Sequence, residues 1–412
     1  LDRSLEAPRL ALALVGERQA ARAANDVPDK AEEGDRTAPP AALSRAQKLA
    51  RSGKNRLAIS AYEDLLKRDP DDVDAMVALA GLYFDVNQDA APALKLLETA
   101  LERVPDHWLA WTYRGIVTWS MGDRQQAIVA FRSASQFAPQ QPRPYLDWAR
   151  RLKSLGQIDE AVEVLETGSA AVEDNARLFY ELGSCLKELK RYDDCARALR
   201  ESLRIDPDFA DAHVTLGAVL NDFLKRPAEA LPHMDRAVQL KPNAISYHNR
   251  GVIRARLGDL EPAEEDFLAA VELDKAYVKA LYNLGLLYHK QENWKKAVEI
   301  YRRAIEVKPE YAEAHCNLGN VLIMKGRFQE GLLSLERGHE LGSQREDWPY
   351  PTNRWLREAE DYVRLEGDLE GLERGAPFPE GDGERLDLAE VARRTGRHLL
   401  AAELYQAVFE EQ

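Results

Sequence analysis

Asparagine recurs at a spacing of 34 residues in the second half of the chain, at Asn249, Asn283 and Asn317. An amide side chain carries both a hydrogen-bond donor and an acceptor. A row of amides can therefore bind the backbone of an extended peptide without requiring one peptide sequence. Asn320 lies about one helical turn beyond Asn317 and would extend the row. The chemistry that this pattern predicts is non-covalent peptide binding.

Other residues that we expect to line the same groove as the asparagines change in character along the chain. The earlier ones are apolar or aromatic, namely Val77, Phe84, Tyr113, Ile116 and Trp119. The later ones are basic, namely His248, Arg256, Lys279, His289 and Lys290. We therefore expect two subsites, an early one for a helix or hydrophobic motif and a late one for an extended acidic segment. Aromatic burial and charge complementarity favour these partners.

The residue types that enzymes use are not arranged for catalysis. A protein kinase needs a glycine-rich phosphate loop, a strand lysine, a catalytic aspartate and a magnesium-binding D-F-G motif. The sequence contains none of them, and its glycine cluster Gly381–Gly383 is interpreted as a linker. Paired acidic residues such as Glu264 and Glu265 are interpreted as solvated charge. We expect no catalytic residue and no cofactor.

The cysteines and histidines do not predict a metal site. The three cysteines, Cys185, Cys195 and Cys316, have no metal-ligand spacing. They indicate a protein from a reducing compartment, and we interpret Cys195 as a small buried residue because other repeats have alanine at its place. His213 and His315 occupy equivalent places in the period, and we interpret both as packing residues because no clustered partner accompanies them.

The net charge of the 412-residue chain is −14 and its pI is about 5.2. Such a charge argues against general binding to nucleic acids, which requires a basic surface, and against an anionic membrane surface. The longest early apolar run, Leu10–Val15, is too short to span a bilayer. We expect a cytoplasmic protein without an anchor, and the oligomeric state stays open.

A repeat must position these residues. Glycine or alanine recurs every 34 or 35 residues, at Ala46, Ala80, Gly115, Ala149, Gly183, Gly217, Gly251, Gly285 and Gly319. Between Tyr277 and Pro309, apolar residues recur every three or four positions in two runs, the pattern of two amphipathic helices. We expect antiparallel helix pairs in which Gly285 faces Ala297 and Tyr301 fills the wedge toward the next pair.

The order of small residue, aromatic, alanine, aromatic, alanine and proline in each unit resembles the tetratricopeptide repeat, at the same spacing. The resemblance implies an all-α fold, a right-handed α–α superhelix with helical caps. It also implies a non-catalytic scaffold that binds partner proteins or peptides in a concave groove. Ala93 and Ala230 arrive one residue late, which predicts lengthened turns at Val86–Asn87 and Leu224–Lys225.

The sequence predicts four regions. Residues 1–40 are expected to form an N-terminal helix over 1–24 and a linker. Residues 41–342 hold nine repeats, 343–383 a capping helix and a second linker, and 384–412 a degenerate terminal repeat. Caps are expected because each end of a solenoid exposes an apolar face.

The tail carries a narrower resemblance in three segments, Arg337–Ser343, Trp348–Pro351 with Trp355, and Leu399–Ala402. It is similar to the C-terminal repeat region of bacterial eukaryote-like serine/threonine protein kinases. The alternative function is therefore a regulatory or targeting region of such a kinase, whose catalytic domain would lie upstream of Leu1.

The asparagine row resembles the asparagine ladder of O-linked N-acetylglucosamine transferases, whose amides hold peptide backbone. Only three rungs match, because Tyr113, Asp147, Glu181 and Thr215 occupy the earlier ones. A clamp for a terminal carboxylate, built from Lys279, Asn283 and Arg256, ranks below a general peptide groove because its register differs from that of the clamp family.

Overall fold

The structure, a computed structural model, describes residues 41–410. Within that range it contains helices and no strand. The N-terminal helix and linker predicted over 1–40 lie outside the described residues. The chain divides into two compact units, one ending at Pro105 and one beginning at Asp106.

The first unit contains two helix pairs. They are α2 (Ala41–Arg51) with α3 (Asn55–Arg68), and α4 (Val73–Asn87) with α5 (Ala90–Arg103). Leu43, Tyr62 and Leu79 form much of its core.

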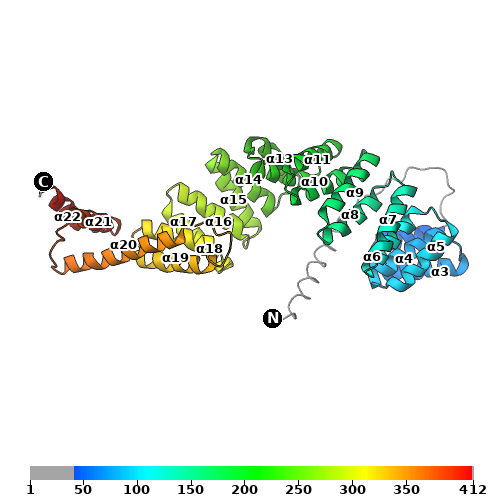
Figure 1. Cartoon of the computed structure of the whole chain (residues 1–412), viewed down its shortest axis with the longest axis horizontal. Helices are drawn as coiled ribbons and strands as arrows, with labels where there is room; N and C mark the ends of the chain where they lie inside the picture. The colour runs from blue at the N-terminus through cyan, green and yellow to red at the C-terminus, as the bar shows by residue number, and fades with distance from the viewer. Residues whose placement is uncertain (1–40, 411–412) are drawn as a thin grey trace. The chain divides into compact units, whose positions relative to one another are not determined.

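The second unit continues with helices joined by short turns (Figure 1). Its seven pairs are α6 (Trp108–Ser120) with α7 (Arg124–Phe137), α8 (Pro142–Ser154) with α9 (Ile158–Ala171), α10 (Ala176–Glu188) with α11 (Tyr192–Ile205), α12 (Ala210–Ala218) and its continuation η2 (Val219–Phe223) with α13 (Pro227–Leu240), α14 (Ala244–Leu257) with α15 (Leu260–Leu273), α16 (Val278–Lys290) with α17 (Trp294–Val307), and α18 (Ala312–Met324) with α19 (Phe328–Gly342). The long helix α20 (Thr352–Glu373) and the pair α21 (Asp382–Arg394) and α22 (His398–Glu410) follow. The expected fold class, an all-α repeat solenoid, is confirmed.

The recurring glycines of the first helices allow a large side chain of the second helix to approach. A Cβ atom at Gly285 would lie 2.5 Å from the ring of Tyr301, and one at Gly115 would lie 2.9 Å from Phe131. Tyr301, rather than the expected Ala297, is thus the nearest neighbour of Gly285. Tyr301 fills its own pair, because a ring needs the space that a missing side chain leaves.

In the two repeats whose alanine arrives one residue late, at Ala93 and Ala230, the extra residue lies in a helix and not in a turn. The predicted lengthened turns are therefore wrong. In the second pair, α4 extends to Asn87 and only two residues precede α5. In the sixth pair, the first helix ends in the π-helical segment η2 (Val219–Phe223). A π-helical turn accommodates one additional residue without ending the helix.

First helices of successive pairs contact each other directly, as α6 with α8, α14 with α16 and α16 with α18. In the second unit, the face that the first helices α6, α8, α10, α12, α14, α16 and α18 form is called the inner face below. At the other end of this unit, α20 packs on α19 (Figure 1) and contributes Leu365 and Leu369 to a core with Phe328 and Leu388. The tail is therefore folded onto the last repeat pair.

Candidate functional site

The inner face carries one equivalent residue per first helix, two positions before the small residue of each repeat. These residues are Tyr113, Asp147, Glu181, Thr215, Asn249, Asn283 and Asn317. All but Asp147 and Asn317 are at least partly exposed. The period of the sequence thus becomes a row of side chains on one face, and the structure brings the predicted amides together at the α14, α16 and α18 end.

His248 links the first two amides of the row. The Asn283 amide nitrogen lies 2.8 Å from His248 Nε2, and the Asn249 amide oxygen lies 3.2 Å from His248 Nδ1. An amide NH₂ donates to Nε2, so the proton of the neutral ring is on Nδ1 and is donated to Asn249. This bridge joins α14 to α16, and nothing in the spacing of the asparagines predicts it.

His248 is buried, and this burial lowers its pKa below the ordinary value. The hydrogen bond to Asn249 acts in the opposite direction, whereas the nearby Lys279 ammonium lowers the pKa further. A protonated ring would present a donor at Nε2 to the Asn283 donor. The neutral ring is thus the form that fits the bridge.

The third amide is also used inside the protein. Asn317 is only 8 % exposed, and its amide nitrogen donates to the Tyr282 hydroxyl at 2.9 Å. The Tyr282 hydroxyl lies 3.2 Å from the hydroxyl of Tyr350, a residue of the turn between α19 and α20. Part of the predicted ladder is therefore covered by the protein's own tail.

The predicted basic residues differ in their environment. Arg256 donates to the backbone and side-chain oxygens of Asn221 in η2, so it joins two repeats. Lys279 and Lys290 are exposed, and neither forms an ion pair within the part of the chain that the structure describes. Asn320 is half-buried and its amide has no hydrogen bond to any residue between 41 and 410.

The predicted early subsite is less open than its sequence implies. Val77 and Ile116 are buried core residues and offer no surface to a partner. The Arg143 guanidinium lies over the Tyr113 ring, at 4.7 Å from its centre. Trp119 is partly buried against the core around Tyr145. Phe84, which like Val77 belongs to the first unit, is half-buried.

A cluster of arginines around Asp147 on α8 was not among the sequence predictions. Asp147 is buried, and Arg143, Arg150 and Arg151 approach its carboxylate to between 3.1 and 3.7 Å. One carboxylate cannot neutralise three guanidinium groups, so this part of the inner face is locally basic. The sequence signal was present, because arginine lies both four residues before and three residues after Asp147 on one helix.

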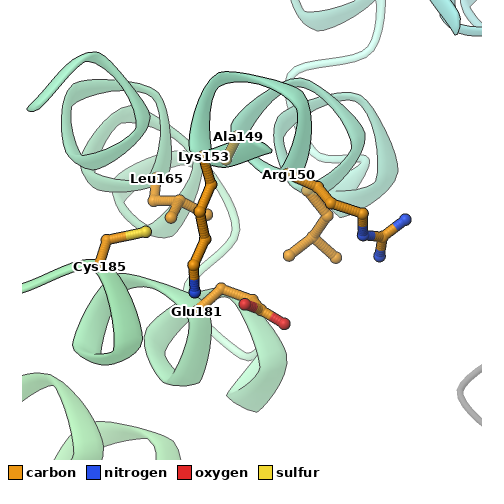
Figure 2. A pocket seen from close by; sticks show the side chains of 7 residues that line it. Ala149, Arg150, Lys153, Leu165, Glu181 and Cys185 are labelled. Atoms are coloured by element: carbon orange, nitrogen blue, oxygen red, sulfur yellow. The ribbon is translucent and has the colours of Figure 1, made fainter. Parts of the chain in front are cut away.

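A small pocket lies between α8 and α10 (Figure 2), with Leu146 and Leu165 among its lining residues. Lys153 extends across it toward α10, where its ammonium group bonds Glu188 at 2.8 Å and Ser184 at 2.9 Å. The cavity measures about 30 Å³, which is the space of roughly one water molecule. It is too small for a substrate.

The cysteine thiols are poor nucleophiles. Burial raises the pKa of Cys185 and of Cys195 to about 11 and that of Cys316 to about 12. A thiol reacts as its thiolate, and these thiols are protonated at neutral pH. All three are free and buried, as a packing role requires.

The two histidines singled out by their spacing bond the preceding turn. His213 Nε2 lies 2.9 Å from the Pro207 carbonyl oxygen, and His315 Nε2 lies 2.9 Å from that of Pro309. A carbonyl oxygen only accepts, so each ring donates there. These are contacts of packing residues, and among the described residues no group of three or more potential ligands is placed to hold a metal.

No helix between residues 41 and 410 combines the length and the apolar character that a membrane crossing needs.

Comparison with protein families matches three models of one repeat to the chain. One model of the tetratricopeptide repeat matches residues 49–112, 119–182 and 152–220, and a second matches 86–142 and 248–306. A further TPR repeat model matches residues 287–326. Together the matches cover more than half of the chain.

Several curated proteins are similar over part of the chain. Human tetratricopeptide repeat protein 13 is 27 % identical over 40 % of this chain and 20 % of its own length. Protein FlbA of Caulobacter vibrioides is 28 % identical over 45 % and 31 %. Mouse DnaJ homolog subfamily C member 7 is 29 % identical over 47 % and 42 %. The chain thus spans less than half the length of each of these relatives.

Among solved structures, YrrB is described as a TPR protein with an unusual peptide-binding site. It is 28 % identical with a TM-score of 0.41, and the match covers 45 % of this chain and 95 % of that one. The C-terminal part of a TPR repeat-containing protein from Cytophaga hutchinsonii is 15 % identical with a TM-score of 0.44, over 67 % and 99 %.

Proposed function

Because the chain belongs to the tetratricopeptide repeat family, we propose that it is a non-catalytic scaffold that binds partner proteins, or extended segments of them, on its inner face. Proteins of this family generally mediate protein–protein interactions. The fold supplies a surface, and the side chains on that surface must supply the specificity.

The observation that carries the proposal is the presence of unpaired polar groups on the inner face around α16. Lys279 and Lys290 form no ion pair and Asn320 no side-chain hydrogen bond within the described range. Lys279 lies one helical turn before Asn283 on α16, so the two residues share one face of that helix. Groups of this kind can exchange bonds to water for bonds to a peptide.

The charge of this surface favours an extended acidic segment. Lys279 and Lys290 add unpaired positive charge on α16, whereas Arg256 on α14 is bonded to Asn221 and pairs with Asp222 at 4.0 Å. Complementary charge raises the association rate and excludes segments of the wrong sign. At the equivalent place on α18, Glu313 is paired with Arg345, so the unpaired positive charge lies on α16 and the acidic segment would bind there.

The test compares two charge-reversed pairs in the full chain. The first variant, Lys279→Glu with Lys290→Glu, changes the charge of the inner face. The control variant, Lys275→Glu with Lys295→Glu, makes the same change in charge away from the inner face, because Lys275 lies in a turn and Lys295 on the second helix α17. Both control lysines are also exposed and without an ion pair in the described structure. Partners are captured by crosslinking from native lysate and counted by mass spectrometry. We expect the first pair to lose at least one partner that the wild type and the second pair retain.

Equal recovery of all partners by both variants would discard this part of the inner face as the site. Neither Lys279 nor Lys290 is a hydrogen-bond partner of His248, Asn283 or Asn317. A loss can therefore be attributed to the surface once both variants melt at the same temperature.

The regulatory region of a serine/threonine protein kinase stays the second prediction, on the resemblance of the tail alone. Sequencing the gene upstream of the codon for Leu1 tests it, because the prediction requires kinase motifs in the same reading frame.

A further inference from the structure

The segment Ser343–Pro351, called the return segment below, leaves α19 and folds back on the inner face. Arg345 Nη1 lies 2.7 Å from a carboxylate oxygen of Glu313 on α18, and the Tyr350 hydroxyl lies 3.2 Å from that of Tyr282 on α16. Glu313 and Tyr282 lie on first helices, near the amide row. The return segment is thus bound where the proposed function places a partner.

Aromatic rings form most of this contact. The Tyr282 ring packs against Tyr311 with 5.1 Å between centres. On the other side, the Tyr350 ring lies 4.8 Å from that of Trp348 and 5.8 Å from that of Trp355. The Asn317 amide donates to the same Tyr282 hydroxyl that meets Tyr350. The return segment therefore covers Asn317, the third amide of the row.

The sequence of the return segment suits a bound peptide. Pro349 and Pro351 flank Tyr350, so the backbone around the ring is restricted before binding and little chain entropy is lost. Arg345 stacks over the Trp348 ring at 5.3 Å while it bonds Glu313. An arginine followed by a tryptophan–proline–tyrosine–proline turn is thus the chemistry that this surface accepts.

The contact is also incompletely satisfied, which makes it displaceable. The indole nitrogen of Trp348 is buried and has no hydrogen-bond partner among the described residues. A buried polar atom without a partner costs free energy. Residues 343–347 and Pro349 are exposed, so few side chains hold the segment. Such regions open at lower cost than the packed helices.

We propose that the return segment is an internal ligand of the inner face, and that a partner peptide with an arginine and an aromatic–proline turn competes with it for Tyr282, Glu313 and Asn317. This inference rests on the proposed function, because it names the chemistry of the part of the partner that docks on Tyr282 and Glu313, beside the acidic part that the exposed lysines of α16 favour, and the regulation of the same face. The tether keeps the segment at a high effective concentration. In the wild type, a partner binds only to the fraction of molecules in which the segment is released.

The test uses a fluorescent synthetic peptide with the sequence of residues 342–352 and measures its anisotropy on addition of the full chain. We expect little binding to the wild type. We expect binding at least about tenfold tighter to the Arg345→Ala, Tyr350→Ala variant, since its own segment has lost both anchors. Adding Glu313→Ala to that variant should abolish the gain. Arg354→Ala, which removes an exposed arginine of α20 paired with Glu358, serves as the control and should behave as the wild type.

The proposal is overturned if the anchor variant melts like the wild type and still does not bind the peptide, or if the wild type binds it equally well. Hydrogen exchange of the wild type covers the case in which the variant does not fold. If the segment is displaceable, the backbone amides of Arg345 and Trp348 should exchange faster than those of α18. If these two amides exchange only when α18 unfolds, the segment is not displaceable. Failure here leaves the partner capture through Lys279 and Lys290 unaffected, so the two proposals fail separately.

Discussion

At the scale of single residues, the same side chains serve packing and the inner face. Gly285 is a glycine because the ring of Tyr301 occupies the place of its Cβ atom. Asn283 and Asn317 bond residues of the preceding repeat, so they join repeats as well as lining the face. A substitution of these asparagines therefore changes stability and binding together. The exposed lysines of α16 separate the two effects.

Gly285→Ala should destabilise the protein by roughly 1 to 3 kcal/mol, because the added methyl group overlaps the Tyr301 ring in a packed core. The measurement is urea unfolding followed by circular dichroism. Gly367→Ala in α20 is the matched control. A Cβ there meets no atom within 4 Å, and alanine is the better helix former, so its stability should rise by up to about 1 kcal/mol. The same sign of change for both substitutions would contradict the packing explanation.

Asp266→Ala should cost about 3 to 5 kcal/mol of stability. Asp266 is only 2 % exposed, and its carboxylate accepts three bonds from Arg250, at 2.6, 3.0 and 3.2 Å, and one from Arg254 at 3.0 Å. Its loss leaves two partly buried cations without their main counter-ion. Thermal melting measures the change against Asp193→Ala, which removes an exposed carboxylate and should be nearly neutral. Similar melting of both variants would show that the buried pair contributes little.

At the scale of the elements, each helix pair turns through one residue with positive φ. Glycine takes this place in several pairs, for example Gly122 and Gly258. Lys190, Lys225 and Glu292 take it in others, with φ between 57° and 60°. Side chains rarely adopt this conformation because the Cβ atom approaches the backbone. These turns therefore hold strain that the helix packing on either side maintains.

Glu292→Gly should stabilise the eighth repeat by roughly 0.5 to 1 kcal/mol, because glycine adopts this turn conformation at no steric cost. Glu299→Gly in α17 makes the same chemical change inside a helix, where glycine costs about 1 kcal/mol relative to alanine. The two variants should shift the unfolding midpoint in opposite directions. A lower midpoint for Glu292→Gly would mean that the turn is not strained.

At the scale of the whole molecule, four histidines share one direction of pKa change. Burial lowers the pKa of His233, His248, His289 and His315 below the ordinary value. At these four histidines the folded protein then binds fewer protons than the unfolded chain once the pH falls below about 6.5. Stability rises with pH wherever the unfolded state binds more protons, so it must fall here as the pH decreases.

The unfolding midpoint should be constant above about pH 7 and should decrease progressively between about pH 6.5 and pH 5. The salt-bridged carboxylate of Glu390, whose pKa the hydrogen bond from Arg393 helps to lower to about 2, stays ionised over this range and does not confound the result. A His248→Gln variant should show a smaller decrease, since one of the four titrating groups is gone. A midpoint that is constant or rises toward pH 5 would contradict the prediction.

The repeat period predicted the helix pairs well, because each unit repeats the same alternation of apolar faces. It also placed Asn249, Asn283 and Asn317 on one face. It predicted Val77 and Ile116 as surface residues, yet both are buried. Periodicity gives the direction of a side chain from its own helix, whereas exposure depends on what the neighbouring repeat places over it.

The sequence by itself determined the all-α repeat fold, because each unit contains within about 34 residues the pattern that forms and ends its two helices. Only the tertiary structure decided which groups of the inner face are free. Asn283 meets His248 and Asn317 meets Tyr282 at 35 residues' separation, and Tyr350 meets Tyr282 at 68. Contacts between residues so distant in sequence depend on how the repeats stack and where the tail returns, and no local pattern encodes either.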